Sequence, residues 1–339
     1  MSRVESALVG VDHQVIIVDD NSPDGTWELA QEEATRSVRV VLLKRPGKMG
    51  LASAFLDGLA RSDGDLIALM DADLQHPPEL LPQMLARIDD GADIAIASRF
   101  VKGGGVGEWS SARRLVSWGA RLMCTLALPR TSGIRDTMSG FFIMRRAIID
   151  GITLSPSSFK ILLEVLAKGE YHRVDEVPYI FEPRRKGHSK LGSGEMWNYV
   201  KHLVSLSIET KEILTFIRFC LVGLSGVVVN EAIFWALTSH LGVYFVLAGG
   251  ISAEAAIVSN FTWNDMWTFR AKARGAGAFR RAIRFLRFNI SMVGGVLISL
   301  VVLYILSTAL GISPLISNLF AIVTSMLWNY GASTKLVWR

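Results

Sequence analysis

The feature that most constrains this chain is a set of four long apolar stretches at its C-terminal end. They cover residues 216–239, 244–267, 288–310 and 314–336. A helix needs about 20 apolar residues to cross the hydrocarbon core of a bilayer, and each stretch reaches that length. Charged residues are frequent before the first stretch and sparse within the four. The sequence therefore predicts a soluble domain followed by an all-α membrane domain with four transmembrane helices.

The distribution of charge predicts how such a membrane domain is oriented. The chain has 36 Lys and Arg against 31 Asp and Glu, but beyond Asp265 it has basic residues and no acidic ones. Residues 270–287 are strongly basic, whereas the connections at 239–243 and 311–313 contain no Lys or Arg. By the positive-inside rule the basic segment, the C-terminus and the soluble domain all face the cytoplasm. We expect a multi-pass protein of the cell (cytoplasmic) membrane, with the catalytic domain cytoplasmic and no nucleic acid as partner.

The membrane part also shows an internal repeat. Arg218 and Phe219 open the first apolar stretch as Arg287 and Phe288 open the third, and each stretch reaches Leu-Gly after the same interval. The second and fourth stretches both contain Trp-Asn, at residues 263–264 and 328–329. We expect two tandem helical hairpins of the same orientation.

The soluble part alternates strand and helix patterns. Short runs rich in Val and Ile predict strands at residues 14–18, 38–43, 65–70 and 93–97. Apolar residues at three- and four-residue spacing predict helices at residues 26–36, 51–61 and 79–89. This alternation indicates an α/β domain with a mostly parallel sheet. Ligands of such sheets bind beyond the carboxyl ends of the strands.

Two acidic loops follow predicted strands. In the first, Asp71, Ala72 and Asp73 lead to Gln75 and His76. Two carboxylates separated by one residue suit a hard divalent ion that also takes diphosphate oxygens and waters. His76 is more typical of a loop residue than of a metal ligand.

The second loop starts at Asp19 and opens the helix at residue 26 through Pro23 and Gly25. A turn followed by a helix N-cap explains part of this composition. The Asp20 carboxylate can in addition accept hydrogen bonds from a nucleoside.

Three ordered motifs, at residues 18–26, 71–77 and 184–191, together resemble the dolichyl-phosphate (polyprenyl-phosphate) mannose synthases of glycosyltransferase family 2. The resemblance covers about residues 12–192. The membrane part resembles the small four-span domain linked to bactoprenol-dependent glucosylation, which is fused to some of these synthases. The resemblance implies a GT-A (Rossmann-like) nucleotide-sugar transferase domain at residues 1–192. We expect a juxtamembrane amphipathic helix at 193–215 and four transmembrane helices, in two tandem hairpins, at 216–339.

The resemblance also implies roles for individual residues. Asp71, Asp73 and Gln75 would bind Mg²⁺ or Mn²⁺ and, with Ala72, the donor diphosphate. Val18 and Asp20 would lie near the nucleoside, and Arg99 and Arg113 would approach the lipid phosphate and the donor. Arg114 is an alternative to Arg113 for this role. Arg113 is preferred because of its spacing from Trp109. A loop carrying Arg184, Ser189 and Lys190 would close over the site. The implied catalytic residues are Asp73, Arg99, Arg113, Arg184 and Lys190.

The implied reaction moves a hexose, most readily mannose from GDP-mannose, to a polyprenyl (dolichyl-type) monophosphate with inversion. A phosphate monoester has its second pKa near 6, so this acceptor is already an anion at neutral pH and needs charge and positioning rather than a base. A Gln-x-x-Arg-Trp pattern, found in polysaccharide synthases of the same broad family, is absent from the sequence. Two alternatives stay open: a glucosyl donor such as UDP-glucose, and a non-enzymatic lipid-sugar flippase or scaffold.

Two further expectations concern the acidic residues inside the predicted spans and the N-terminal residues of the chain. Glu231 and Glu254 fall inside predicted spans, where ionisable side chains are costly, so they are expected to pair with Arg218 or an Asn, or to handle the lipid head. The family it resembles opens with an apolar strand and a Pro-Thr-x-Asn-Glu type loop, which residues 1–11 lack. Residues 2–8 instead resemble the tail of the helix that would follow that strand. We expect that strand to be missing and its neighbours to expose unpaired backbone groups.

Overall fold

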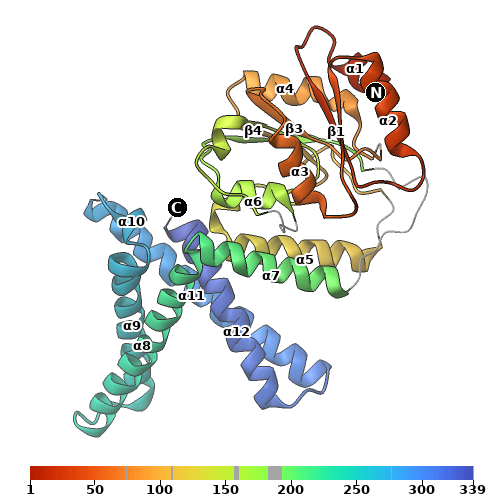
Figure 1. The fold of residues 1–339 in the computed structure, drawn as a ribbon. Helices are drawn as coiled ribbons and strands as arrows, with labels where there is room; N and C mark the ends of the chain where they lie inside the picture. Colours follow the sequence, from red (N-terminus) through yellow and green to blue (C-terminus); the bar gives the residue numbers. More distant parts are fainter. Residues whose placement is uncertain (74, 108–109, 156–159, 182–192, 276, 339) are drawn as a thin grey trace. The chain divides into compact units, whose positions relative to one another are not determined.

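The computed structural model describes the whole chain except residues 74, 108–109, 156–159, 182–192, 276 and 339 (Figure 1). The chain forms two compact units. The first comprises residues 1–124 and 130–206, and the second comprises residues 125–129 and 207–339. The expected α/β domain followed by a helical membrane domain is confirmed, although the division falls after Leu206 rather than at residue 192.

The first unit contains two sheets in its described residues. Strands β1 (Val15–Asp19) and β2 (Val40–Lys44) pair in parallel. The second sheet has the order β3-β5-β4-β6 and consists of β3 (Leu66–Leu69), β4 (Ile94–Ser98), β5 (Phe142–Arg145) and β6 (Val174–Pro178). Strand β5 is antiparallel to both β3 and β4, while β4 and β6 are parallel. The sheet is therefore mixed rather than mostly parallel, because one strand of opposite direction was inserted between β3 and β4.

Strands β1 and β3 are each paired on one side only in the part of the chain that the structure describes. Each of these edges carries backbone groups that lack a partner strand among the described residues. The expectation of a missing strand itself stays a prediction.

The described part of the first unit contains helices at and beyond the predicted positions. They are α1 (Ser2–Ala7), α2 (Thr26–Arg36), α3 (Leu51–Leu59), α4 (Leu81–Asp89), α5 (Ser111–Ala127), α6 (Ile161–Lys168) and α7 (Ser193–Glu209). Helices α2, α3 and α4 begin and end close to the predicted residues. Helix α2 starts where predicted because Gly25 adopts a left-handed conformation, with φ of 81°, and Asp24 accepts hydrogen bonds from the backbone and side chain of Thr26. A 3-10 turn, Pro78–Leu80, precedes α4.

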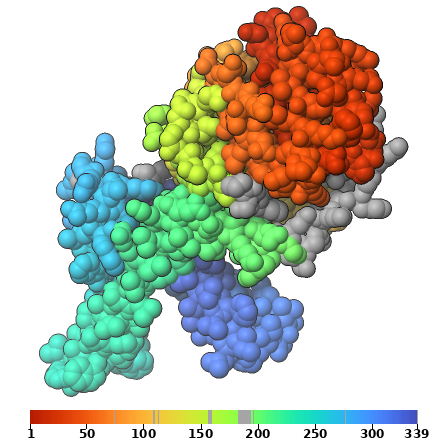
Figure 2. Space-filling view, viewed as in Figure 1, coloured from red at the N-terminus to blue at the C-terminus, as the bar shows by residue number. Residues whose placement is uncertain are grey.

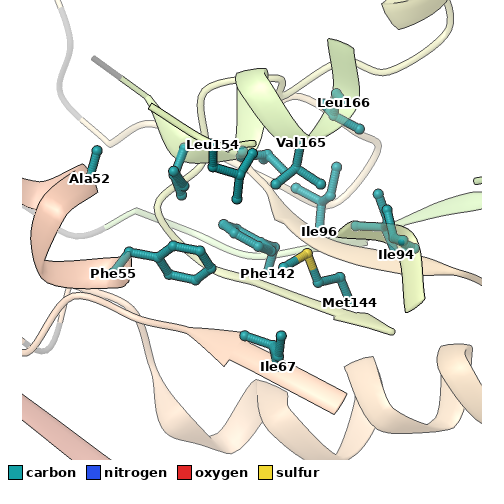
Figure 3. Close-up of a cluster of buried hydrophobic side chains, with 13 residues drawn as sticks. Ala52, Phe55, Ile67, Ile94, Ile96, Phe142, Met144, Leu154, Val165 and Leu166 are labelled. Carbon is teal, nitrogen blue, oxygen red and sulfur yellow. The ribbon is translucent and has the colours of Figure 1, made fainter. Parts of the chain in front are cut away.

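The four-stranded sheet is buried on both faces, which fixes the positions of its strand ends. On one face Ile94, Ile96, Phe142 and Met144 pack with Phe55 of α3 and Val165 of α6 (Figure 3). On the other face the alternate residues Ala95, Ala97 and Ile143 pack against Met84 and Ile88 of α4. This period of two is what a strand with two covered faces requires.

Helices α5 and α7 lie side by side and form an amphipathic pair (Figure 1). The Tyr199 hydroxyl donates a 2.9 Å hydrogen bond to the Ala120 carbonyl, and Leu203 is buried. Large apolar side chains remain exposed on both helices, among them Leu115, Trp118, Trp197, Val204 and Ile208. The amphipathic helix expected up to residue 215 ends at Glu209, because Lys211 adopts a left-handed conformation with φ of 61° and starts the next helix.

The second unit consists of helices. They are α8 (Glu212–Ser239), α9 (Phe245–Trp263), α10 (Arg270–Ala273), α11 (Ala278–Tyr304) and α12 (Pro314–Ala332), with π-helical turns at Asn264–Thr268, Ile305–Ala309 and Ser333–Val337. Three described segments, Glu212–Ser239, Phe245–Thr268 and Ala278–Ala309, are long and apolar enough to cross a membrane. Helix α12 occupies the place of the fourth predicted span but falls outside this group, because polar residues such as Asn318 and Asn329 lower its mean hydropathy.

Two hairpins of the second unit, α8–α9 and α11–α12, correspond to one another. The interval between Arg218 and Arg287 also separates the π-helical turn Asn264–Thr268 from Ser333–Val337. The same interval separates Asn260 from Asn329. The Trp-Asn pairs at residues 263–264 and 328–329, which the sequence suggested as equivalent, are separated by a shorter interval and differ from this correspondence by about one helical turn. The structural correspondence therefore supports a duplication with that interval.

An aromatic cluster joins the two hairpins at one end. Each hairpin contributes three aromatic residues at corresponding positions: Phe219, Phe261 and Phe269 from the first, and Phe288, Tyr330 and Trp338 from the second. The rings of Phe269 and Trp338 stack with centroids 4.5 Å apart. Away from this cluster the hairpins diverge and form separate arms (Figure 2).

Candidate active site

The acidic loop after β3 presents two carboxylates at the carboxyl end of the sheet. Asp71 is partly exposed, and Ala72 and Asp73 are exposed. The Asp73 carboxylate accepts a 3.1 Å hydrogen bond from the backbone N–H of Gln75, whose side chain is buried. This bond closes the loop locally.

His76 supports the loop from behind and is only 3% exposed. Its Nδ1 accepts a 3.2 Å hydrogen bond from the backbone N–H of Asp71. Its ring packs among Phe141, Tyr179 and Phe181, with centroids 5.5–6.2 Å away. Burial lowers the pKa of His76, against the opposing effect of the neighbouring aspartates. A neutral imidazole that accepts from Asp71 therefore sets the direction in which this loop leaves β3, a role that the sequence alone did not indicate.

Gly140 leaves room for the Asp71 side chain. A Cβ atom at this position would lie 3.0 Å from Oδ2 of Asp71 and 3.1 Å from Cε1 of His76. Both distances are tighter than ordinary van der Waals contact, so a side chain at residue 140 would displace the carboxylate. Gly140 immediately precedes the buried residues leading into β5, which places it beside the end of β3.

Arg99 follows β4 and is held by a buried acid, Asp136. Its Nε and Nη2 atoms donate to the two carboxylate oxygens at 2.8 and 2.7 Å, and its backbone N–H donates at 3.0 Å. Burial opposes the charge on Arg99, but the bonds to Asp136 raise its pKa overall. Asp136 is 1% exposed, and it was not identified from the sequence because it lies far from Arg99 along the chain.

A basic pocket of about 470 Å³ opens beside Arg99. Arg114 and Arg121 of α5 line it together with Arg99 and a glycine-rich segment at residues 104–107. Arg113, which sequence spacing favoured, is not among the lining residues. Burial and the positive charge of Arg99 lower the pKa of Arg113. Arg121 was missed because it lies two helical turns beyond Arg114, outside the motifs of the sequence.

The loop after β1 is organised by two different interactions. Asp19 is buried and accepts hydrogen bonds from the backbone and hydroxyl of Ser22 at 2.8 and 2.7 Å. Asp20 pairs with Arg45, a 6% exposed arginine that also binds Ser53 and Asp57. The Asp20 carboxylate is therefore directed by Arg45, which sequence reasoning did not find.

The remaining residues expected from the sequence either have few described contacts or lie outside the described part of the chain. Val18 lies on β1, and its side chain is 3.4 Å from where a Cβ of Gly58 would stand. Arg184, Ser189, Lys190 and Trp109 lie outside the described residues. In the second unit Glu231 accepts a 3.2 Å hydrogen bond from Asn230, and both Glu231 and Glu254 are exposed.

Comparisons with known proteins identify the two units. Residues 4–153 match the glycosyl transferase family 2 model, and residues 218–338 match the GtrA/DPMS transmembrane domain. A dolichol-phosphate mannosyltransferase of Pyrococcus furiosus is 42% identical over 337 residues, which cover 99% of this chain and 94% of that protein. The chain belongs to this family of glycosyltransferases. It is therefore an enzyme and a multi-pass membrane protein, and a purely non-enzymatic scaffold is set aside.

Other relatives align with a smaller share of the chain. The dolichol-phosphate mannosyltransferase of Saccharomyces cerevisiae is 34% identical over 218 residues, covering 61% of this chain and 80% of that protein. That of Mycosarcoma maydis is 37% identical over 202 residues, covering 57% and 66%. The glucosyl-3-phosphoglycerate synthase of Mycobacterium tuberculosis, solved with Mn²⁺, UDP-glucose and phosphoglyceric acid, aligns with 60% of this chain and 74% of its own, at a TM-score of 0.45 and 15% identity.

The donor atoms of this glycosyltransferase fit a divalent ion held mainly by its substrate. Among the described residues no three His, Cys, Asp or Glu side chains gather as a protein-only metal cage. Asp71 and Asp73 offer two carboxylates at one strand end, with the Asp71 side chain 39% exposed. Mg²⁺ is usually bound by one or two carboxylates together with phosphate oxygens and waters. Two carboxylates therefore suffice, provided that a diphosphate completes the coordination.

Proposed function

We propose that this enzyme transfers mannose from GDP-mannose to a polyprenyl (dolichyl-type) monophosphate, with inversion at the anomeric carbon. The observation that carries the proposal is the placement of the acidic loop at Asp71 and Asp73 after β3 and of Arg99 after β4, the two strands that flank β5. Arg99 lines a basic pocket together with Arg114 and Arg121 of α5. The acidic loop suits a metal diphosphate and the pocket suits a phosphate acceptor. The activity for which the three relatives are named, dolichol-phosphate mannosyltransferase, supports this choice of sugar and lipid.

The acceptor needs positioning rather than deprotonation. A phosphate monoester is largely dianionic at neutral pH, so one of its oxygens can attack the anomeric carbon directly. The bond from that carbon to the diphosphate breaks, and the nucleoside diphosphate leaves with the electron pair. The described arginines supply planar guanidinium donors to the phosphate. The Nδ1 atom of buried His76 accepts a hydrogen bond from the Asp71 backbone, so the ring is engaged in holding the loop, and a dianionic acceptor needs no base.

Asp71, Asp73 and Gln75 would hold Mg²⁺ or Mn²⁺ in this proposal. When bound, such an ion supplies positive charge to the diphosphate leaving group. Arg45 keeps the carboxylate of Asp20 oriented at the end of β1, where that carboxylate would accept hydrogen bonds from the nucleoside. Arg184 and Lys190 are proposed to complete the site from the loop that the structure leaves undescribed.

We also propose that the first unit, the basic segment at residues 270–287 and the C-terminus face the cytoplasm. The support is the positive-inside rule applied to the helical hairpins. Single cysteines placed at Leu241 and Ser313, in a chain without Cys124 and Cys220, should react with an impermeant reagent added from outside intact cells. Labelling from outside near Gly275 would reverse the orientation.

The decisive experiment measures transfer from radiolabelled GDP-mannose and UDP-glucose to polyprenyl phosphate by the full chain in detergent. We expect GDP-mannose to be used and Arg121→Gln to raise the KM for polyprenyl phosphate about tenfold or more, since it removes a charge-assisted bond. Arg61→Gln, an exposed arginine after α3, is the matched control and should change nothing. Preference for UDP-glucose would show that the donor is a glucosyl nucleotide rather than GDP-mannose. Unchanged kinetics in Arg121→Gln would show that the pocket does not bind the acceptor phosphate.

A further inference from the structure

A second basic pocket lies within the second unit, at the end of the first hairpin where α9 passes through a π-helical turn into α10 (Figure 1). Its volume is also about 470 Å³. Three guanidinium groups line it: Arg218 from α8, and Arg270 and Arg274 from α10 and the residue that follows. Trp267 and Thr268 of the π-helical turn complete the wall.

The described residues that line this pocket include no acidic side chain to compensate its charge. The carboxylate nearest in sequence belongs to Asp265, and it is already engaged elsewhere. It accepts hydrogen bonds from Arg284 at 3.1 Å and from the Trp338 indole at 3.0 Å, and it pairs with Arg281 at 3.3 Å. Three positive charges thus converge on a cavity without a counter-charge from that aspartate, which favours an anion as ligand.

The pocket also contains features that suit a lipid headgroup. The Trp267 ring is 43% exposed, and its centroid lies 5.8 Å from the Arg218 guanidinium carbon. Indole rings of this kind prefer the interface between hydrocarbon and water. The Thr268 hydroxyl is buried without a hydrogen-bond partner at the wall of the pocket. π-helical turns recur at functional positions because they re-aim side chains out of the α-helical pattern.

The second hairpin shows what happens to the corresponding arginine when no ligand site is built around it. Arg287, which corresponds to Arg218, donates a 3.3 Å hydrogen bond to the carbonyl of Leu336, the residue corresponding to Trp267. In the first hairpin Trp267 lies against the guanidinium instead, and Arg218 faces the pocket. The two hairpins therefore differ at this position: the arginine of the second makes a hydrogen bond to the backbone, and the arginine of the first lines an open cationic cavity.

We propose that this pocket binds the phosphate of an anionic membrane lipid, through Arg218, Arg270 and Arg274. Basic pockets between transmembrane helices bind phosphate headgroups in this way. The site belongs wholly to the second unit, and its ligand takes no part in sugar transfer. A phosphate bound in this pocket would link α8 to the segment after α9, because it would contact arginines from both.

The test measures lipid binding by the full chain in detergent, by native mass spectrometry, with phosphatidylglycerol, phosphatidylcholine and inorganic phosphate as separate probes. We expect phosphatidylglycerol to bind in preference to phosphatidylcholine. Arg274→Gln should weaken that binding about fivefold, the factor for one charge at a membrane surface, and Arg218→Gln at least as much. Arg274 is exposed, so its replacement leaves the packing of the helices undisturbed even where Arg218→Gln does not.

Lys272→Gln and Arg280→Gln are the matched controls, because both remove a positive charge from the same basic segment but neither residue lines the pocket. Both should bind phosphatidylglycerol within about twofold of the unaltered chain. Equal losses in the controls would indicate diffuse attraction and overturn the site. Inorganic phosphate binding that is lost in Arg274→Gln, without any gain from the lipid, would support the pocket and make free anion its ligand. Unchanged lipid binding in Arg274→Gln would overturn the proposal.

Discussion

The guanidinium of Arg99 and the carboxylate of Asp136 form a two-pronged ion pair, with hydrogen bonds of 2.8 and 2.7 Å. The pair does more than neutralise charge. The backbone N–H groups of Arg135 and Asp136 donate to the Glu176 carboxylate on β6, at 2.9 and 3.0 Å. Arg99 after β4 is thereby tied through Asp136 to the neighbouring strand, so its direction at the basic pocket is fixed by the sheet.

We predict that Asp136→Asn strongly destabilises the first unit and impairs transfer. Removing one partner of a buried pair leaves an uncompensated charge and costs about 3–5 kcal/mol. Asp175→Asn is the matched control, because Asp175 pairs with Arg173, whose side chain is 45% exposed, and such a surface pair contributes at most about 1 kcal/mol. Thermal unfolding and acceptor KM should be measured for both. Equal small losses would show that the Arg99 pair does not hold the site.

We predict that Asp73→Ala abolishes transfer without altering the melting temperature. Asp73 is exposed, and the replacement of an exposed side chain usually changes stability by less than about 0.5 kcal/mol. The proposed ion and diphosphate, by contrast, depend on its carboxylate directly. Turnover is measured at saturating Mg²⁺ and then at saturating Mn²⁺. Activity within a few-fold of the unaltered enzyme would exclude Asp73 from the metal site.

We predict that Gly140→Ala lowers activity by about tenfold or more, because the added methyl would press on the Asp71 carboxylate and on His76. Overpacking of this kind typically costs about 1–3 kcal/mol of stability. Gly119→Ala serves as control, since a Cβ there meets nothing within 4 Å and alanine in a helix is favoured by about 1 kcal/mol. Full activity in Gly140→Ala would mean that Asp71 can move without consequence.

Much of the fold could be predicted from local patterns, while the support of the site could not. Helix α2 begins and ends at the predicted residues because Asp24, Gly25 and its apolar spacing all act within a few residues. By contrast, Asp136 reaches Arg99 only after β5 is inserted beside β4, and Arg45 reaches Asp20 only after β1 pairs with β2. Strand order creates these contacts, and a single sequence carries no local signal of it.

A prediction about pH concerns the contact that holds α1 to the turn before α4. Arg3 donates two 2.8 Å hydrogen bonds to Glu79, and these bonds lower the pKa of Glu79 to about 2. A carboxyl whose folded-state pKa is depressed adds stability above its unfolded pKa, about 4.3, and loses it as pH falls toward 2. Because both side chains are largely exposed, the effect is below about 1 kcal/mol.

Melting of the unaltered chain and of Arg3→Gln should therefore differ slightly at pH 6.5, with a smaller difference at pH 3.5. A difference that grows as the pH falls would contradict the ion pair. Arg36→Gln provides the control, since Arg36 pairs within its own helix and should report only on local helix stability.

The last prediction uses the duplicated hairpins of the second unit. Gly226 of α8 and Gly295 of α11 occupy corresponding positions, and a Cβ at either would overlap the side-chain amide of the asparagine opposite, Asn260 or Asn329. These glycines let the two helices of each hairpin approach closely, as small residues do in membrane helix pairs. Gly226→Ala and Gly295→Ala should each destabilise the unit by about 1–3 kcal/mol, measured as thermal unfolding in detergent. Gly223→Ala, where a Cβ meets nothing within 4 Å, should be neutral. The double change Gly226→Ala with Asn260→Ala removes the overlap and should recover most of the loss caused by the first. If the double variant is no more stable than Gly226→Ala alone, close packing of Gly226 on Asn260 is not what the hairpin requires.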